Sequence, residues 1–110
     1  MKYLLLLYAS ESEMPQVTPE LQQVWYAVGQ EAKDAGVLLS SSGLSPIANA
    51  TTVRVRNGKT LTTDGPFAET HEQLGGYFLL DCKDLDEAIG WAAKIPTARY
   101  GSVEVRPLWS

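Results

Sequence analysis

The sequence predicts an α+β fold of the ferredoxin-like type, a split βαβ pattern that builds an antiparallel sheet and carries an inserted β-hairpin. Strand-like and helix-like segments alternate along the chain, both helix-like segments have clear start and stop signals, and an Asn-Gly pair joins two short strand-like runs near the middle. With 110 residues, of which 45% are hydrophobic and 20% charged, the chain is expected to form one domain over residues 1–110.

The first predicted strand runs from Lys2 to Ala9 and is apolar on both of its alternating faces. Such a strand favours burial on both sides. Its leucine run, Leu4 to Leu7, is too short for a membrane span, which needs roughly 20 residues. The polar segment that follows has no small-residue cleavage pattern, so we interpret the run as a strand and not as a targeting signal.

The first predicted helix begins at Thr18-Pro19, where Thr can cap the helix and Pro lacks only an N–H that would be unpaired anyway. Apolar residues recur after it at helical spacing: Leu21, Val24, Trp25, Val28, Ala32 and Ala35. Gly36 supplies the stop.

A short strand over Val37 to Ser40 precedes the predicted hairpin, whose strands are Thr51 to Arg56 and Lys59 to Thr63. The Asn57-Gly58 pair between them is typical of a two-residue type I′ turn. In that register one face carries Arg54, Arg56, Lys59 and Leu61. We expect the charges near the turn to be solvated and to discourage edge-to-edge aggregation.

The remaining elements are a strand over Gly76 to Cys82, a helix over Asp84 to Lys94 and a last strand over Ser102 to Arg106. Asp84 is the expected N-cap and Glu87 stands at the capping-box position. In this arrangement both helices cover the same face of the sheet. The other face is also apolar along the first strand, which predicts a second copy packed sheet against sheet in a homodimer.

The charge and cysteine content exclude several classes of protein. A net charge of -4 without a run of Lys or Arg argues against a nucleic-acid partner and against an acidic membrane surface. The single cysteine, Cys82, cannot form an internal disulfide and is expected to be an inert buried thiol. We therefore expect a cytoplasmic protein.

Residues 63–78 are the candidate site, because they hold the only histidine of the chain together with three carboxylates. Asp64-Gly65-Pro66 has two compatible interpretations. It is a turn, since Asp can bond its own backbone, Gly tolerates unusual angles and Pro fixes φ. It also holds the Asp64 carboxylate in a defined place, which proton transfer requires.

Glu69, His71 and Glu72 follow within a few residues and can converge with Asp64 on a pocket. No spaced metal-ligand signature supports a metal ion, and we expect no cofactor. Thr70 and Gln73 match a capping box, which predicts a single helical turn. Gly75-Gly76 is expected to form a bulge or a close backbone contact where the chain re-enters the sheet.

These residues carry a family resemblance. The run from Asp64 to Thr70 and the run from Glu72 to Tyr77 resemble the signature of the YCII-related, DGPF-domain family. The likeness extends over Thr51 to Lys59, Asp84 to Ala88 and Gly101 to Pro107, and so covers most of the chain.

The resemblance implies a dimeric α/β barrel and a small-molecule protein of unsettled activity. Related proteins are suspected of using a His/Asp pair, but the first helix here has no histidine, so only Asp64 is carried over. We expect acid/base chemistry of lyase or isomerase type at Asp64, assisted by Glu69 or His71. The residues expected to bind the substrate are Tyr26, Arg54, Gly65, Pro66 and Phe67. The alternative is a non-catalytic accessory or regulatory module, linked to extracytoplasmic-function sigma factors.

Overall fold

Four strands form one antiparallel sheet in the computed structural model, which describes residues 1–12, 18–68 and 70–109. Their order across the sheet is β2 (Leu38–Gly43), β5 (Gln73–Asp81), β1 (Lys2–Ala9) and β6 (Ser102–Pro107). The first strand of the chain is therefore central, as its apolar composition indicates. This is the ferredoxin-like arrangement that the sequence predicts.

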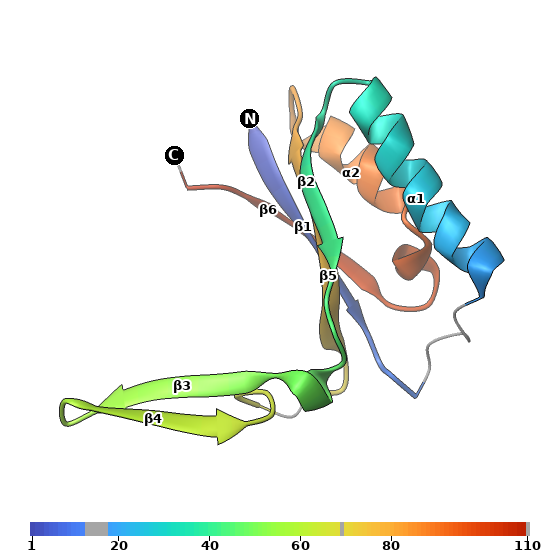
Figure 1. Cartoon of the computed structure of the whole chain (residues 1–110). Coiled ribbons are helices and arrows are strands. Elements are labelled where there is room, and N and C mark those ends of the chain that lie inside the picture. Colours follow the sequence, from blue (N-terminus) through green and yellow to red (C-terminus); the bar gives the residue numbers. More distant parts are fainter. Residues whose placement is uncertain (13–17, 69, 110) are drawn as a thin grey trace.

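Both helices lie on the same face of this sheet (Figure 1). They are α1 (Pro19–Asp34) and α2 (Leu85–Lys94). Thr18 caps α1 by accepting a hydrogen bond of 3.1 Å from the Leu21 N–H, and Asp84 caps α2 by accepting one of 2.9 Å from the Glu87 N–H. The predicted caps are confirmed. Two short 3-10 helices, Ile47–Asn49 (η1) and Pro96–Arg99 (η2), were not predicted.

The core lies between the sheet and the two helices. On β1 the alternate residues Tyr3, Leu5, Leu7 and Ala9 are buried. The buried cluster around them also contains Val28, Ala32, Phe78, Leu80, Cys82, Ala88, Ala92 and Ile95. Cys82 is buried beside Leu80 as the strand periodicity predicts, and Val103 and Val105 of β6 pack against the cluster.

The opposite face of the sheet has no helix over it, and we call it the open face. Its centre is apolar, because Leu4 pairs with Leu79 and Leu6 pairs with Tyr77 across β1 and β5. These side chains are only partly buried. On the β6 side Leu6 and Leu4 stand opposite the charged residues Glu104 and Arg106. An apolar centre with a polar border is the usual composition of a protein interface.

The strands β3 (Thr51–Arg56) and β4 (Lys59–Asp64) form a separate two-stranded sheet. Asn57 and Gly58 between them have φ angles of 53° and 75°, which confirms the predicted type I′ turn. The hairpin projects away from the rest of the chain, on the side of the open face (Figure 1). The radius of gyration of 15.7 Å is accordingly larger than the roughly 13 Å of a compact domain of this size.

Two local predictions between the hairpin and the sheet have different outcomes. The expected bulge is present: the register of β1 with β5 passes from Leu7–Gly76 to Tyr8–Leu74 and leaves Gly75 out. The prediction of a helical turn from Thr70 to Gln73 is wrong. The Thr70 hydroxyl donates to the carbonyl oxygen of Glu72 at 2.6 Å, and β5 begins at Gln73, three residues earlier than predicted.

No helix within the described ranges is both long and apolar enough to cross a membrane.

Candidate functional site

The base of the hairpin builds the Asp64 turn. β4 ends at Asp64, and Gly65 continues with a φ of 98°, a conformation that side chains disfavour. The Gly65 N–H donates to the Ala50 carbonyl oxygen at 2.6 Å, and the Thr52 hydroxyl donates to the Gly65 carbonyl oxygen at 2.9 Å. Both polar backbone groups of Gly65 are therefore bonded to the first strand of the hairpin and the residue before it, which fixes the turn.

Arg54 extends this support to the next residues of the loop. Its guanidinium donates to the carbonyl oxygen of Phe67 at 3.4 Å. The Phe67 side chain is 76% exposed. Four of the predicted substrate-binding residues thus lie close together near the base of the hairpin: Arg54, Gly65, Pro66 and Phe67. The Arg54 side chain is hydrogen-bonded there to the backbone of Phe67.

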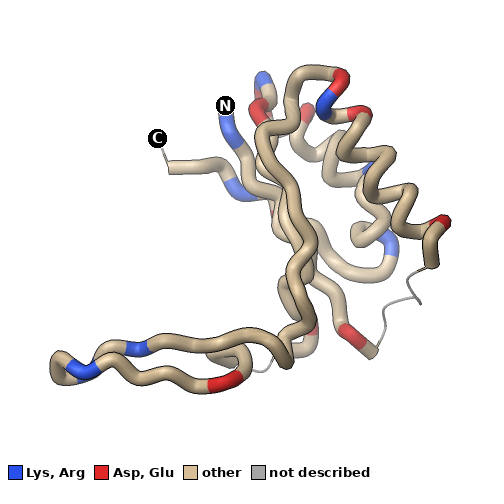
Figure 2. The backbone as a smooth tube through the Cα atoms, in the orientation of Figure 1, with Lys and Arg blue, Asp and Glu red and all other residues tan. Residues whose placement is uncertain are grey.

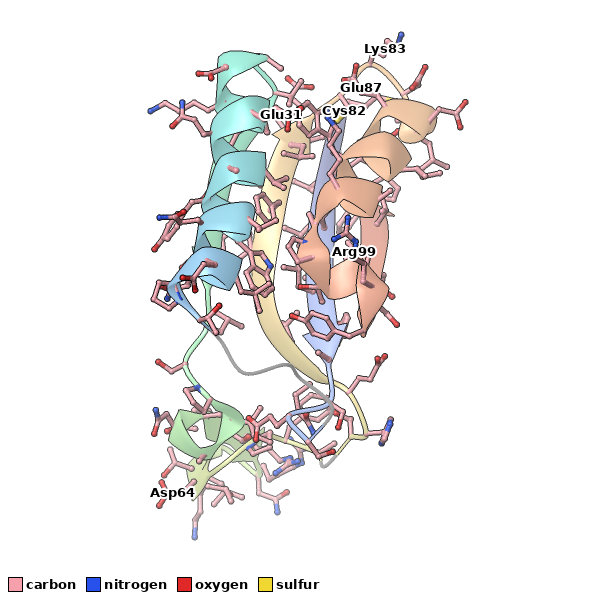
Figure 3. The ribbon with its side chains drawn as sticks, turned by 90° about the vertical axis from the view of Figure 1, so that its right-hand side faces the viewer. Glu31, Asp64, Cys82, Lys83, Glu87 and Arg99 are labelled. Atoms are coloured by element: carbon pink, nitrogen blue, oxygen red, sulfur yellow. The ribbon has the colours of Figure 1, made fainter. Side chains whose placement is uncertain are left out.

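The Asp64 carboxylate is exposed at this turn, opposite Thr51 in the hairpin register. Figure 3 places Asp64 at the lower end of the molecule, far from Cys82 and Glu87 at the other end of the sheet. Within residues 1–12, 18–68 and 70–109 the carboxylate has no hydrogen bond or ion pair. The turn therefore fixes the backbone of Asp64 and leaves its carboxylate available to a ligand.

The other predicted catalytic residues follow on the same connection. His71 is exposed, and Glu69 lies outside the described residues. Glu72 accepts a hydrogen bond of 3.0 Å from the Ser102 hydroxyl, so its carboxylate ties the loop to β6. Among the residues that the structure describes, no three His, Cys, Asp or Glu side chains gather into a possible metal site.

Tyr26 lies elsewhere, on a cleft that sequence reasoning missed. The cleft has a volume of about 810 Å³ and lies between α1 and the sheet edge formed by β2 and β5. Asp64, His71, Arg54 and Phe67 are not among its lining residues. Within one chain the structure therefore separates Tyr26 from Asp64, His71, Arg54 and Phe67.

Aromatic side chains and small polar groups line the cleft. Trp25, Tyr26 and Phe78 are aromatic, and Ser41 and Ser42 contribute hydroxyl groups. Tyr26 is 73% exposed at the mouth, whereas the Trp25 ring is partly buried and its Nε1–H donates to the Thr97 hydroxyl at 3.3 Å. This hydrogen bond fixes the ring in the cleft wall.

Small residues open this space, and they are the signal that could have revealed it. Gly29 faces Phe78 from the interior of α1, and a Cβ there would lie 3.8 Å from the Phe78 ring. Gly43 pairs with Gly76 across β2 and β5. A glycine within a helix and a pair of glycines on neighbouring strands reduce the side-chain volume at one end of the sheet.

Cys82 is a buried thiol outside both sites. Burial, together with repulsion of the thiolate by the nearby Glu87 carboxylate, raises its pKa from 9.0 to about 11. The thiolate is the reactive form, so Cys82 is inert near neutral pH, as the sequence predicts.

The fold and the two sites define a class of protein: a ferredoxin-like α+β domain with a projecting hairpin, a loop anchored at its base and an open aromatic cleft beside the first helix. The chain belongs to the YCII-related domain family, whose model matches residues 1–110. It is also 46% identical over 84 residues to the uncharacterized protein R00369 of Rhizobium meliloti (strain 1021), covering 74% of this chain and 68% of that protein. The family membership predicted from the sequence is confirmed.

Proposed function

We propose that this YCII-related protein is a homodimer that binds a small molecule in the cleft beside α1. The cleft itself supports this most directly: its volume of about 810 Å³ lies within the usual range for small-molecule sites. The open face supports the dimer, because Leu4, Leu6, Tyr77 and Leu79 form an apolar surface that a second copy would cover.

The lining indicates the kind of ligand. The walls are mainly apolar and aromatic, and among the described residues only Glu11 and Lys33 bring a charge to the cleft. Hydrogen bonds are offered by Ser41, Ser42 and the amide side chains of Gln22, Gln30 and Gln73. The expected ligand is a small organic molecule with an apolar or aromatic body and a few neutral hydrogen-bonding groups.

We further propose acid/base chemistry of lyase or isomerase type at Asp64, with Glu69 or His71 assisting. Support comes from the turn, since Gly65 is bonded through both its N–H and its carbonyl oxygen while the Asp64 carboxylate is exposed. Arg54, Gly65, Pro66 and Phe67 would then contact the substrate beside it. A carboxylate held on a fixed backbone suits proton transfer.

The alternative is a non-catalytic accessory module, including one that acts with an extracytoplasmic-function sigma factor. It is favoured by the position of Asp64, which does not line the cleft. In that case the cleft binds a molecule without converting it, and the turn at Asp64 serves only to join the hairpin to the loop.

A ligand screen tests the binding function. Uniformly ¹⁵N-labelled protein would be mixed with a library of small aromatic acids, phenols, amides and lactones at millimolar concentration, and amide shifts recorded. We expect compounds that shift Gly29, Ser41 and Ser42 and that bind at least tenfold more weakly to Tyr26→Ala. Ile89→Ala is the control, because Ile89 is also exposed but lies on α2, away from the cleft and from the Asp64 turn. A library without any compound that shifts these amides would contradict the proposal.

The same compounds separate catalysis from binding. If wild-type protein converts a bound compound and Asp64→Asn binds it without converting it, Asp64 is the acid/base residue. If no bound compound is converted, or if Asp64→Asn converts it at the wild-type rate, Asp64 is not a catalytic residue.

A further inference from the structure

The hairpin formed by β3 and β4 occupies 14 of the 110 residues of the chain. It belongs to no larger sheet, and an isolated two-stranded hairpin is only marginally stable in water. Val53 and Val55 are each 59% exposed on it. Burial of the two exposed valines against another surface would therefore stabilise this projecting hairpin.

The two faces of the hairpin differ in chemistry. The register places Val53 and Val55 with Thr60 and Thr62 on one face, which we call the valine face. The opposite face carries Arg54, Arg56, Lys59 and Leu61, as the sequence predicts. The outer half of the valine face has no charged residue, so it can be covered without desolvating an ion.

The direction and length of the hairpin indicate where its partner lies. Figure 1 shows it standing out on the side of the open face, so that the hairpin and the open face form the two arms of an L. Six residues of strand span about 20 Å, whereas two sheets packed face to face are about 10 Å apart. If a second copy packs on the open face, its sheet and part of its helix layer would therefore lie alongside the hairpin of the first copy.

We propose that the hairpin is a clasp that packs its valine face against the second copy of the chain. The proposal rests on the homodimer proposed above and adds a second contact to it, separate from the open face. In the dimer, each copy holds the other with its hairpin, and Val53 and Val55 become buried.

Charge favours a second copy as the occupant. Residues 51–64 contain Arg54, Arg56, Lys59 and Asp64, a net charge of +2, while the whole chain carries -4 and the remaining residues therefore -6. In Figure 2 the hairpin carries mainly blue segments, with one red segment at its base, whereas the rest of the chain carries both red and blue segments. A basic arm and an acidic body attract each other between copies and orient the encounter.

Sedimentation equilibrium of paired variants tests the clasp. Val53→Thr/Val55→Thr keeps the β-branched shape and the strand preference of the hairpin but replaces apolar methyl groups by hydroxyls. We expect its dimer dissociation constant to rise at least about tenfold. Leu61→Thr is the matched control, because it makes a similar change on the opposite face of the same hairpin, and we expect it to shift the constant less than about threefold.

Each outcome bears on one contact. A dissociation constant unchanged in Val53→Thr/Val55→Thr, or raised equally by Leu61→Thr, would overturn the clasp while the dimer stands. Leu6→Glu tests the contact at the open face separately from the hairpin. We expect this variant to be monomeric even when Val53 and Val55 are unchanged. A wild-type protein that sediments as 12.0 kDa monomers at about 100 μM would overturn the dimer and the clasp together, and leave cleft binding to its own test.

Discussion

The Thr52 hydroxyl donates a hydrogen bond of 2.9 Å to the carbonyl oxygen of Gly65, across the base of the hairpin. The side chain of a residue near the start of β3 thereby holds the turn that follows β4. The bond holds the Gly65 carbonyl oxygen, and with it the turn directly after Asp64, although Asp64 itself is exposed.

Thr52→Val should loosen this turn without unfolding the protein. Loss of one hydrogen bond costs about 1 kcal/mol, so we expect the Gly65 amide, which is bonded to Ala50, to exchange about fivefold faster. The urea midpoint of the whole chain should not change, since the hairpin lies outside the core. Thr63→Val, at the register partner of Thr52, is the control and should leave the exchange rate of Gly65 unaltered.

Gly101→Ala should destabilise the fold by about 2 kcal/mol, because a Cβ at residue 101 would overlap the backbone carbonyl oxygen of Tyr8. Gly90→Ala is the matched substitution in open space on α2 and should stabilise it by about 0.5–1 kcal/mol, since alanine favours helix. Urea unfolding of both variants measures the difference. Equal stability of the two would contradict the close approach at Gly101.

Asp84→Ala should cost about 1 kcal/mol of unfolding free energy, because the Glu87 N–H at the start of α2 loses its acceptor. Asp86→Ala removes the same charge from the first turn without removing a cap, and should cost only a few tenths of a kcal/mol. Thermal unfolding followed by circular dichroism compares them. Similar losses would assign the effect to charge and not to the cap.

Stability should fall in alkali partly through Cys82. Its pKa is about 11 in the folded protein, against 9.0 for an ordinary cysteine, so the unfolded chain loses this proton first. The contribution of the thiol to stability is complete below pH 9 and is lost as the pH rises from 9 toward 11. Cys82→Ala should therefore lose less stability than wild type between pH 8 and pH 10.5, as measured by urea unfolding. Parallel losses would show that Cys82 does not contribute.

The sequence alone determined the elements and their order. Helix caps at Thr18 and Asp84, the Asn57-Gly58 turn and the alternating apolar residues of β1 depend on neighbours in the chain, and all were predicted correctly. The prediction for residues Thr70 to Gln73 was wrong, and the reason is again local. Its capping-box pattern also permits side-chain bonds to the loop backbone, and the pairing of β5 extends back to Gln73.

Only the tertiary structure decided how the predicted site is divided. Asp64, Arg54 and Phe67 come together because a hairpin brings its two ends side by side, which the sequence could indicate. The cleft at Tyr26 arises where α1 packs over small residues of β2 and β5, and packing between distant segments has no local pattern. The direction of the hairpin likewise depends on how its base joins the sheet, so the sequence specified the hairpin and its turn while the fold placed it on the side of the open face.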